Sequence, residues 1–194
     1  MHRVPEPARE RRVGATAPAA PAGDPGGGAR SWGEGKARRL VLIVVGIVAL
    51  DYFTKLLVVR SLRHYDQIDL VGQFVRLTFI ENTGAAFGIH IGAYDRVFFL
   101  GLTTLALCAL ALMYWVTPAR DRLRLAAIAL LCAGAIGNLI DRARSARGVV
   151  DFMDVGIGNL RWPVFNVADL AVTTGAILLA FSLWGEERRR EPGP

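Results

Sequence analysis

The sequence predicts an all-α polytopic membrane protein with four transmembrane helices. Hydrophobic residues make up 53% of the 194-residue chain and charged residues only 21%, and the mean hydropathy is +0.35. Between the charged clusters run apolar stretches long enough to cross the roughly 30 Å hydrocarbon core of a bilayer. This composition excludes an ordinary soluble, disordered or disulfide-rich protein, and the length leaves little room for a second full domain.

Four apolar segments are expected to span the membrane, at residues 40–59, 96–116, 123–140 and 164–184. Each approaches or exceeds the ~20 residues that a spanning helix needs at a rise of ~1.5 Å per residue. Helices satisfy their own backbone hydrogen bonds, so helix is the expected state of each span. The third span is the shortest, and we expect it to extend into its flanks or to be buried among the others. Together the spans define a predicted membrane domain, residues 38–184.

The two ends of the chain are expected to be cytoplasmic. Residues 1–37 are rich in Pro, Gly and Ala, which predicts a disordered extension. This extension is not read as a cleavable signal peptide, because the apolar run after it is too long and lacks a small-residue cleavage site. Residues 185–194 form a short polar tail. Lys and Arg concentrate before the first span, in the turn at 117–122 and in the tail, which places these regions in the cytoplasm.

Neither nucleic acid nor a metal is an expected partner. The net charge of +6 comes from residues that flank the spans, and no basic patch is interleaved with aromatic residues. His2, His64 and His90 are isolated from any Cys or acidic pair, so no metal site and no other cofactor are expected. Cys108 and Cys132 lie within spans, where we interpret them as small apolar packing residues.

Ionisable residues within spans are costly and therefore indicate function or internal pairing. Asp51 and Lys55 lie four residues apart in the first span, so they share a helix face and can neutralise each other. We interpret them as a structural ion pair, with a direct chemical role as the alternative. Asp169 lies in the predicted fourth span, and no basic residue follows it before Arg188. It must be protonated, line a wet cavity, or find a partner elsewhere in the chain.

Polar residues gather at the outer ends of the third and fourth spans. Two carboxylates brought close together cannot both ionise easily, so one keeps a proton and the pair can act as base and acid on one water. This is the chemistry of aspartic proteolysis. A proton-coupled transporter and a scaffold whose polar residues only hold helices together remain alternatives. The group comprises Asn138, Asp141, Arg142, Asp151, Asp154, Asn166 and Asp169.

Two further features lie on the side of the membrane predicted to be extracytoplasmic. Residues 75–79 alternate between apolar and polar side chains, which predicts a strand in the long first connection. Asn82 and Gly84 then suit a turn in which small residues allow another backbone to approach; a hairpin without chemistry is an equal alternative. Arg142, Arg144 and Arg147 run against the charge bias of the rest of the chain, which indicates that they pair internally or bind something.

Four motifs, in order along the four spans, resemble those of the bacterial lipoprotein signal peptidases, also called signal peptidase II. Each motif alone is weakly specific, whereas the ordered set is specific and covers residues 38–184. The motifs are Asp-Tyr-Phe-Thr-Lys at 51–55, Asn-Thr-Gly-Ala-Ala-Phe at 82–87, Gly-Asn-Leu-Ile-Asp-Arg at 137–142 continuing to Gly-Val-Val-Asp-Phe at 148–152, and Phe-Asn-Val-Ala-Asp at 165–169. The resemblance to this family does not explain the role of the extension at residues 1–37.

The resemblance implies an aspartic endopeptidase of the bacterial inner membrane that needs no cofactor, and we expect it to be a monomer. It would act on lipidated prolipoproteins among the membrane lipids, cutting before the diacylglyceryl-modified cysteine near the extracytoplasmic face. It would use Asp151 and Asp169 as the catalytic pair. The first extracytoplasmic connection would form a small β-sheet that cradles the substrate. Supporting and substrate-binding positions would be Asp51, Lys55, Asn82, Gly84, Asn138, Asp141, Arg142 and Asn166.

Overall fold

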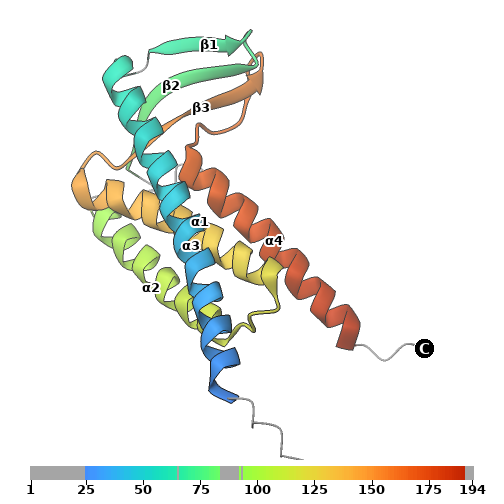
Figure 1. The fold of residues 1–194 in the computed structure, drawn as a ribbon. Coiled ribbons are helices and arrows are strands. Elements are labelled where there is room, and N and C mark those ends of the chain that lie inside the picture. The colour runs from blue at the N-terminus through green and yellow to red at the C-terminus, as the bar shows by residue number, and fades with distance from the viewer. Residues whose placement is uncertain (1–24, 65, 84–91, 93, 191–194) are drawn as a thin grey trace, which may run out of the picture.

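The computed structural model describes residues 25–64, 66–83, 92 and 94–190. These residues form helices at one end and a small sheet at the other (Figure 1). Each predicted span lies in a helix, apart from residues 164–166 at the start of the fourth, and each helix is long and apolar enough to cross a membrane. The predicted fold class is therefore confirmed. The helices are α1 (Pro25–Ser61), α2 (Asp95–Val116), α3 (Arg122–Arg144) and α4 (Val167–Arg190).

The observed helices are longer than the predicted spans at several ends. α1 already begins at Pro25, inside the segment that the sequence predicted to be disordered, and its spanning part is Gly35–Ser61. α3 begins at Arg122, where the Asp121 side chain accepts a hydrogen bond from the Arg124 N–H at 3.1 Å. Such a side-chain cap satisfies one of the amide groups that a helix start leaves without a partner.

α3 is the central helix of the bundle. It packs against α1, α2 and α4, and it is the most buried of the four spans. Its contact with α4 is close because a glycine on each helix faces the other helix. A Cβ atom added at Gly134 would lie 2.3 Å from the carbonyl oxygen of Ala168, and one added at Gly175 would lie 2.9 Å from that of Ala127. Small residues at helix interfaces let backbones approach in this way, and the short third span is buried among the others as expected.

The sheet has four antiparallel strands in the order β1-β2-β3-β4 (Figure 1). β1 (Gln67–Val71) and β2 (Val75–Asn82) come from the first connection, so the strand predicted at 75–79 is present. β3 (Val149–Ile157) and β4 (Leu160–Arg161) come from the connection between α3 and α4. The sheet is therefore shared between two connections, whereas the sequence placed it in the first alone.

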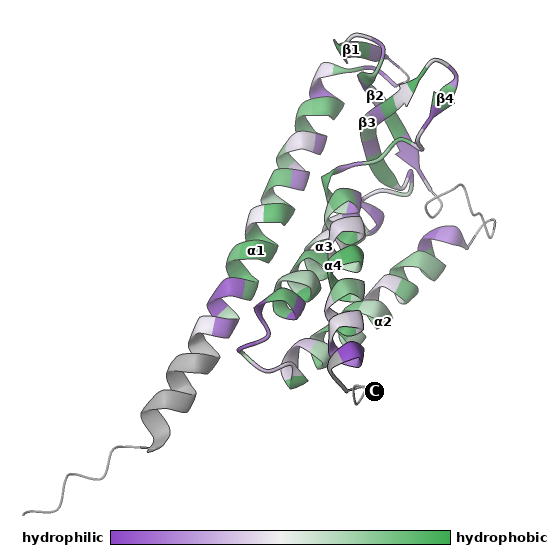
Figure 2. Ribbon diagram, turned by 90° about the vertical axis from the view of Figure 1, so that its right-hand side faces the viewer, coloured by the Kyte–Doolittle hydropathy of each residue, from purple (hydrophilic) through white to green (hydrophobic). Residues whose placement is uncertain are grey.

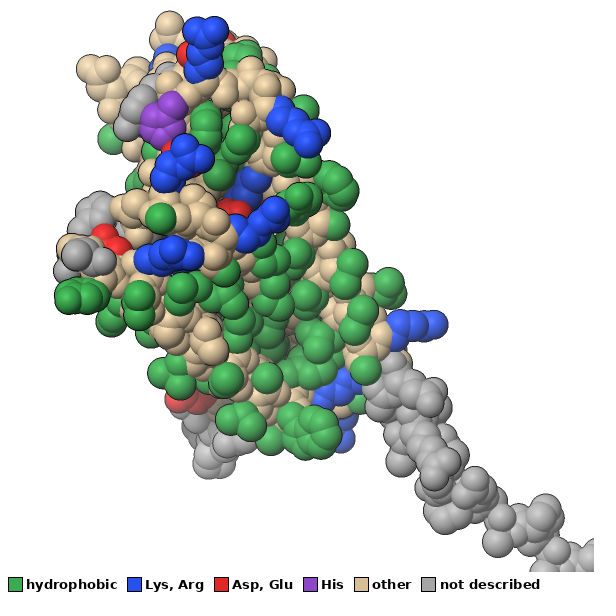
Figure 3. Space-filling view, turned by 90° about the vertical axis from the view of Figure 1, so that its left-hand side faces the viewer, with side chains coloured by type: hydrophobic (Ala, Val, Ile, Leu, Met, Phe, Trp, Pro, Cys, Tyr) green, Lys and Arg blue, Asp and Glu red, His purple; other side chains and the backbone are tan. Residues whose placement is uncertain are grey.

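The sheet rests on the end of α1 through a small apolar core of Val58, Leu62, Phe79 and Phe152. This contact fixes β2 and β3 over the ends of the helices. Apolar residues dominate the middle of the helices and polar residues their ends (Figure 2). One face of the molecule shows a broad apolar band with basic side chains above and below it (Figure 3). Such a large apolar surface is expected to face lipid, so the chain is a multi-pass membrane protein.

Candidate active site between the sheet and the helices

Asp151 lies near the start of β3, opposite Ile80 of β2, and only 3% of it is exposed. Both of its oxygens accept hydrogen bonds from amide side chains. Asn82 Nδ2 donates to Oδ2 at 3.0 Å and Asn166 Nδ2 donates to Oδ1 at 2.7 Å. Burial, followed by the negative charge of Asp169, raises the pKa of Asp151 to about 7, although the two amides oppose this rise. This carboxyl group can therefore hold a proton near neutral pH.

Gly148 allows β2 and β3 to meet beside Asp151. Its φ of +92° lies in the region that favours glycine. A Cβ atom at this position would lie 2.0 Å from the carbonyl oxygen of Asn82. Glycine at 148 thus lets the backbone of Asn82 approach the start of β3, and this approach brings the Asn82 amide to Asp151.

Asp169 lies in the first turn of α4. Asn166 Oδ1 accepts a hydrogen bond from the Asp169 N–H at 2.8 Å, and Asp169 Oδ2 accepts one from the Asn166 N–H at 3.1 Å. This reciprocal pair is a capping box. The span predicted from 164 placed Asp169 too deep, because the residues before Val167 are apolar but not helical. At a helix start, the dipole and the unpaired N–H groups favour a negative charge.

Asn166 connects the two carboxylates. Its side chain is fully buried. The amide nitrogen donates to Asp151, while the amide oxygen accepts from the backbone of Asp169. A second amide, Asn138 Nδ2, donates to Asp169 Oδ1 at 2.7 Å. Together with Asn82, three side-chain amides therefore fix the positions of both carboxyl groups without adding a charge.

A buried ionic network lies behind these amides. Lys55 Nζ lies 2.7 Å from Asp51 Oδ2, 2.7 Å from Asp141 Oδ2 and 3.2 Å from Asn138 Oδ1. The predicted Asp51–Lys55 ion pair is thus present and is joined by a second carboxylate. Asp51 Oδ1 also accepts a hydrogen bond from the Ala168 N–H of α4 at 2.9 Å. The network ties α1 and α3 to the start of α4, next to Asp169.

Both carboxyl groups line one cavity of about 330 Å³. Arg142, on the last turns of α3, lines it with them. The rest of the wall is mostly apolar and comes from the segment before α4 and from α4 itself. A cavity of this kind can hold an apolar chain with one polar group at the two acids. The apolar part of the wall includes Trp162, Pro163, Val164, Phe165, Leu170 and Val172.

The structure does not bring every predicted site residue to this cavity. Asp154 instead forms a 2.6 Å ion pair with Arg161 on the sheet. Gly84 lies outside the described residues. The outer arginines do pair internally: Arg147 Nε lies 3.0 Å from Glu81 Oε1, and Arg144 lies over the ring of Tyr52 at 5.5 Å.

The family profile described as "Signal peptidase (SPase) II" matches residues 43–185, which include Asp51, Asp151 and Asp169. The chain belongs to the signal peptidase II family. The resemblance inferred from the four motifs is therefore confirmed. Lipoprotein signal peptidases from Geobacter sulfurreducens and Syntrophotalea carbinolica are 38% and 41% identical to the chain over 151 and 155 residues, covering 77% and 79% of it and 94% and 96% of themselves.

Solved structures of bacterial membrane enzymes share the fold of this signal peptidase II family member. One, at 32% identity, covers 80% of this chain and 93% of its own with a TM-score of 0.72. Another, at 35% identity, covers 75% and 92% with a TM-score of 0.68. The Staphylococcus aureus lipoprotein signal peptidase is 36% identical over 143 residues, 74% of this chain and 86% of its own.

Three parts of this signal peptidase II site escaped the sequence reasoning. The segment 162–165 lines the cavity but carries no ionisable residue that would have drawn attention to it. Gly148 lies within one of the four motifs, but the motif does not reveal its positive φ. The capping box could have been found, because an Asn followed three residues later by an acidic residue before an apolar run is a helix-start signal.

Proposed function

We propose that this protein is an aspartic endopeptidase that removes the signal peptide from prolipoproteins by cutting before the diacylglyceryl-modified cysteine. The observation that carries this proposal is the position of Asp151 and Asp169. They line one cavity and are joined by Asn166, in a chain of the signal peptidase II family. Two linked carboxyl groups with different environments can serve as acid and base on a single water.

The environments of the two acids support a division of roles. Asp151 is buried in the sheet, and its raised pKa, about 7, favours the protonated form. Asp169 accepts two hydrogen bonds at the start of α4, where a negative charge is favoured. We assign the general base to Asp169 and the general acid to Asp151.

In the proposed reaction, Asp169 takes a proton from water as the oxygen of that water attacks the scissile carbonyl carbon. Asp151 gives its proton to the carbonyl oxygen, which forms a neutral gem-diol. When the carbon–nitrogen bond breaks, the proton on Asp169 passes to the leaving amine. Asp151 recovers a proton from the gem-diol hydroxyl, which becomes the carbonyl of the new carboxyl terminus.

The neighbouring residues are proposed to position the acids and the substrate. Asn82, Asn138 and Asn166 hold the carboxyl groups through the hydrogen bonds described above. Arg142 adds a positive charge to the cavity wall. The apolar wall accommodates the end of the signal peptide, while the diacylglyceryl chains of the substrate stay among the membrane lipids.

The proposed location is the bacterial inner membrane, with the sheet and the acids at the extracytoplasmic face. The described start of α1 and the end of α4 both lie at the end of the molecule opposite the sheet (Figure 1). Lys and Arg concentrate near these ends, which supports cytoplasmic termini. All residues of the proposed machinery come from one chain, so a monomer suffices.

Cleavage of a lipidated precursor by Asp151→Asn and Asp169→Asn variants tests the proposal. Each substitution keeps the shape of the side chain and removes its acid–base chemistry, so we expect turnover to fall by about 10³-fold or more. Asp69→Asn, at an exposed position on β1 outside the cavity, serves as the control and should retain most activity. Turnover near the wild-type rate in either test variant would refute the pair. Proton flux into substrate-free vesicles that Asp169→Asn abolishes would support a transporter instead.

A further inference from the structure

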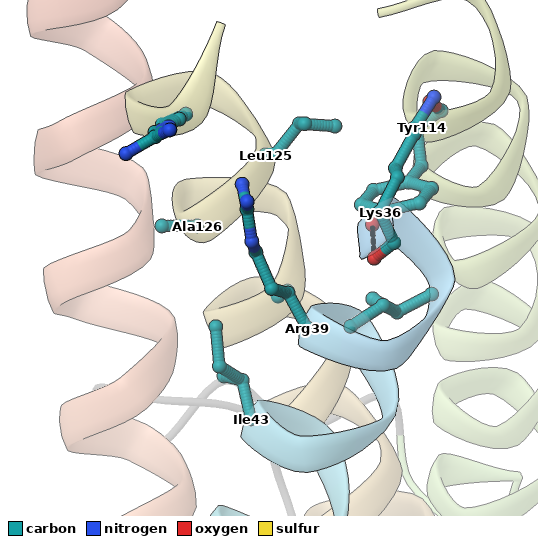
Figure 4. Close-up of a pocket in the computed structure, with 9 residues that line it drawn as sticks. Lys36, Arg39, Ile43, Tyr114, Leu125 and Ala126 are labelled. Atoms are coloured by element: carbon teal, nitrogen blue, oxygen red, sulfur yellow. Dashed lines mark hydrogen bonds between the residues drawn. The ribbon is translucent and has the colours of Figure 1, made fainter. Parts of the chain in front are cut away.

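A second cavity, of about 330 Å³, is shown in Figure 4. Its lining residues lie near the ends of the helices that point away from the sheet and the two acids. It is formed between α1, α2 and α3. Three basic side chains line it, Lys36 and Arg39 from α1 and Arg122 from α3. Nothing in the proposed reaction uses these residues.

The cavity lies at the ends of the spanning helices, where the lipid head groups are expected. Lys36 and Arg39 are at the start of the span Gly35–Ser61, and Arg122 is the first residue of the span Arg122–Arg144. Tyr114, which also lines the cavity, is near the end of the span Asp95–Val116. Because all of these are helix ends away from the sheet, they meet the membrane surface opposite the proposed active site.

Lys36 lines the cavity, but its ammonium group already has hydrogen-bond partners on α2. Its ammonium group donates hydrogen bonds to three backbone carbonyl oxygens at the C-terminal end of α2. These are the oxygens of Tyr114, of Trp115 at 3.2 Å and of Thr117 at 2.8 Å. The Tyr114 hydroxyl donates in return to the carbonyl oxygen of Lys36 at 2.7 Å (Figure 4). The charge of Lys36 thus meets the negative end of a helix dipole, and the pair fixes α1 against α2.

Arg39 and Arg122 differ from Lys36 because both are exposed, and neither forms an ion pair within the part of the chain that the structure describes. Arg39 projects from α1 into the space beside the helix that carries Leu125 and Ala126 (Figure 4). A guanidinium group presents paired N–H donors that match two oxygens of a phosphate. Two such groups on one cavity make a site for a phosphate-bearing anion.

The remaining wall of the cavity is apolar and comes from α1 and α3. It includes Leu40 and Ile43 on α1 and Ala126 on α3. A free phosphate has no apolar surface to bury against this wall, whereas an acyl chain would bury apolar surface there and bind more tightly. Basic pockets between spanning helices at the level of the head groups suit anionic lipids.

We propose that this cavity binds an anionic phospholipid. Arg39 and Arg122 hold the head-group phosphate, and an acyl chain lies against Leu40 and Ile43. A zwitterionic lipid binds less well, because its head-group cation meets Lys36 and the two arginines. The bound lipid would join α1 to α3 at the membrane surface, and this role does not depend on the proposed peptidase reaction.

Native mass spectrometry of the full chain, delipidated in detergent and titrated with phosphatidylglycerol or phosphatidylcholine, tests the proposal. The test variant is Arg39→Gln/Arg122→Gln. The matched control is Arg38→Gln/Arg120→Gln, which removes two charges from exposed positions close in sequence that do not line the cavity. We expect the test pair to weaken phosphatidylglycerol binding about tenfold more than the control pair does, with little change for phosphatidylcholine.

A second variant separates a lipid from a free phosphate. Ala126→Leu narrows the apolar wall and keeps both arginines, so it should weaken phosphatidylglycerol binding, while millimolar inorganic phosphate should not displace the lipid. If the test and control pairs lose the same amount of phosphatidylglycerol binding, the lipid binds through diffuse surface charge and the proposed site is overturned. Displacement by inorganic phosphate, together with unchanged binding by Ala126→Leu, would overturn the lipid as the ligand. Thermal unfolding of each variant confirms that it remains folded.

Discussion

Replacing Lys55 with Met should destabilise the fold more than any exposed charge substitution on the same helix. Lys55 is 4% exposed, and its ammonium group has three oxygen neighbours at 2.7, 2.7 and 3.2 Å. Met keeps a long flexible chain in the same space but offers no charge and no donor. Asp51 and Asp141 then share a buried site without their cation.

The size of the effect follows from this burial. Removing one partner of a buried ion pair costs about 3–5 kcal/mol, because the other charge is left without compensation. Two carboxylates lose their partner here, so the upper half of that range is expected. For a domain of this size, each kcal/mol lowers the unfolding midpoint by about 2–4 °C. The expected fall is therefore roughly 8–20 °C.

Thermal unfolding in detergent, followed by tryptophan fluorescence at neutral pH, measures this midpoint. Arg60→Met, which removes a positive charge from an exposed position near the end of α1, is the control and should change the midpoint by about 2 °C or less. The triple variant Lys55→Met/Asp51→Asn/Asp141→Asn removes the two carboxylate charges together with the cation that compensates them. It should regain at least half of the lost stability, because the three groups act as one unit.

Two results would refute the reasoning about Lys55. A fall no larger than that of Arg60→Met would mean that the buried carboxylates find other compensation. Additional destabilisation by Asp51→Asn and Asp141→Asn on top of Lys55→Met would mean that their charges are not what makes the single variant unstable.

Three further changes test other parts of the site. Because the pKa of Asp151 is raised to about 7, its proton is present below that pH and lost above it, so kcat/KM should fall about tenfold per unit above pH 7; a flat profile to pH 9 contradicts the acid role. Gly148→Ala places a Cβ atom 2.0 Å from the Asn82 carbonyl oxygen and should lower kcat/KM at least about tenfold; unchanged cleavage would show that the strands adjust freely. Gly134→Ala should cost about 1–3 kcal/mol in thermal unfolding through overpacking against α4. Gly101→Ala, where nothing lies within 4 Å, should not destabilise, and an equal loss in both would contradict close packing as the cause.

The spanning helices could be predicted because their signals are local. Hydrocarbon thickness sets the length of an apolar run, and Lys and Arg mark its ends. The Asp51–Lys55 pair was also predictable, since helix periodicity alone puts these residues on one face. The motifs around Asp151 and Asp169 were visible in order along the chain and identified the family.

The second half of the sheet was not predictable in the same way. β3 has no clean apolar–polar alternation, because Asp151 and Asp154 occupy buried positions where a strand ordinarily carries apolar side chains. Asp151 is satisfied by partners remote in sequence, namely Asn82 and Asn166. A pattern that depends on such partners cannot be read from a short window.

By itself, then, the sequence determined the four spans, the residue types of the site and the family, because these depend on local hydrophobicity, spacing and motif order. Only the tertiary structure decided how the acids meet. It placed Asp151 on a strand and Asp169 at a helix start, joined them through Asn166, and brought Asp141 from α3 to Lys55. It also formed the basic cavity of Arg39 and Arg122 from two helices. The physical reason is that Asp151, Asp169 and Lys55 find hydrogen-bond and ion-pair partners on other elements of the fold. Arg39 and Arg122 likewise come from different helices, so only folding brings these groups together.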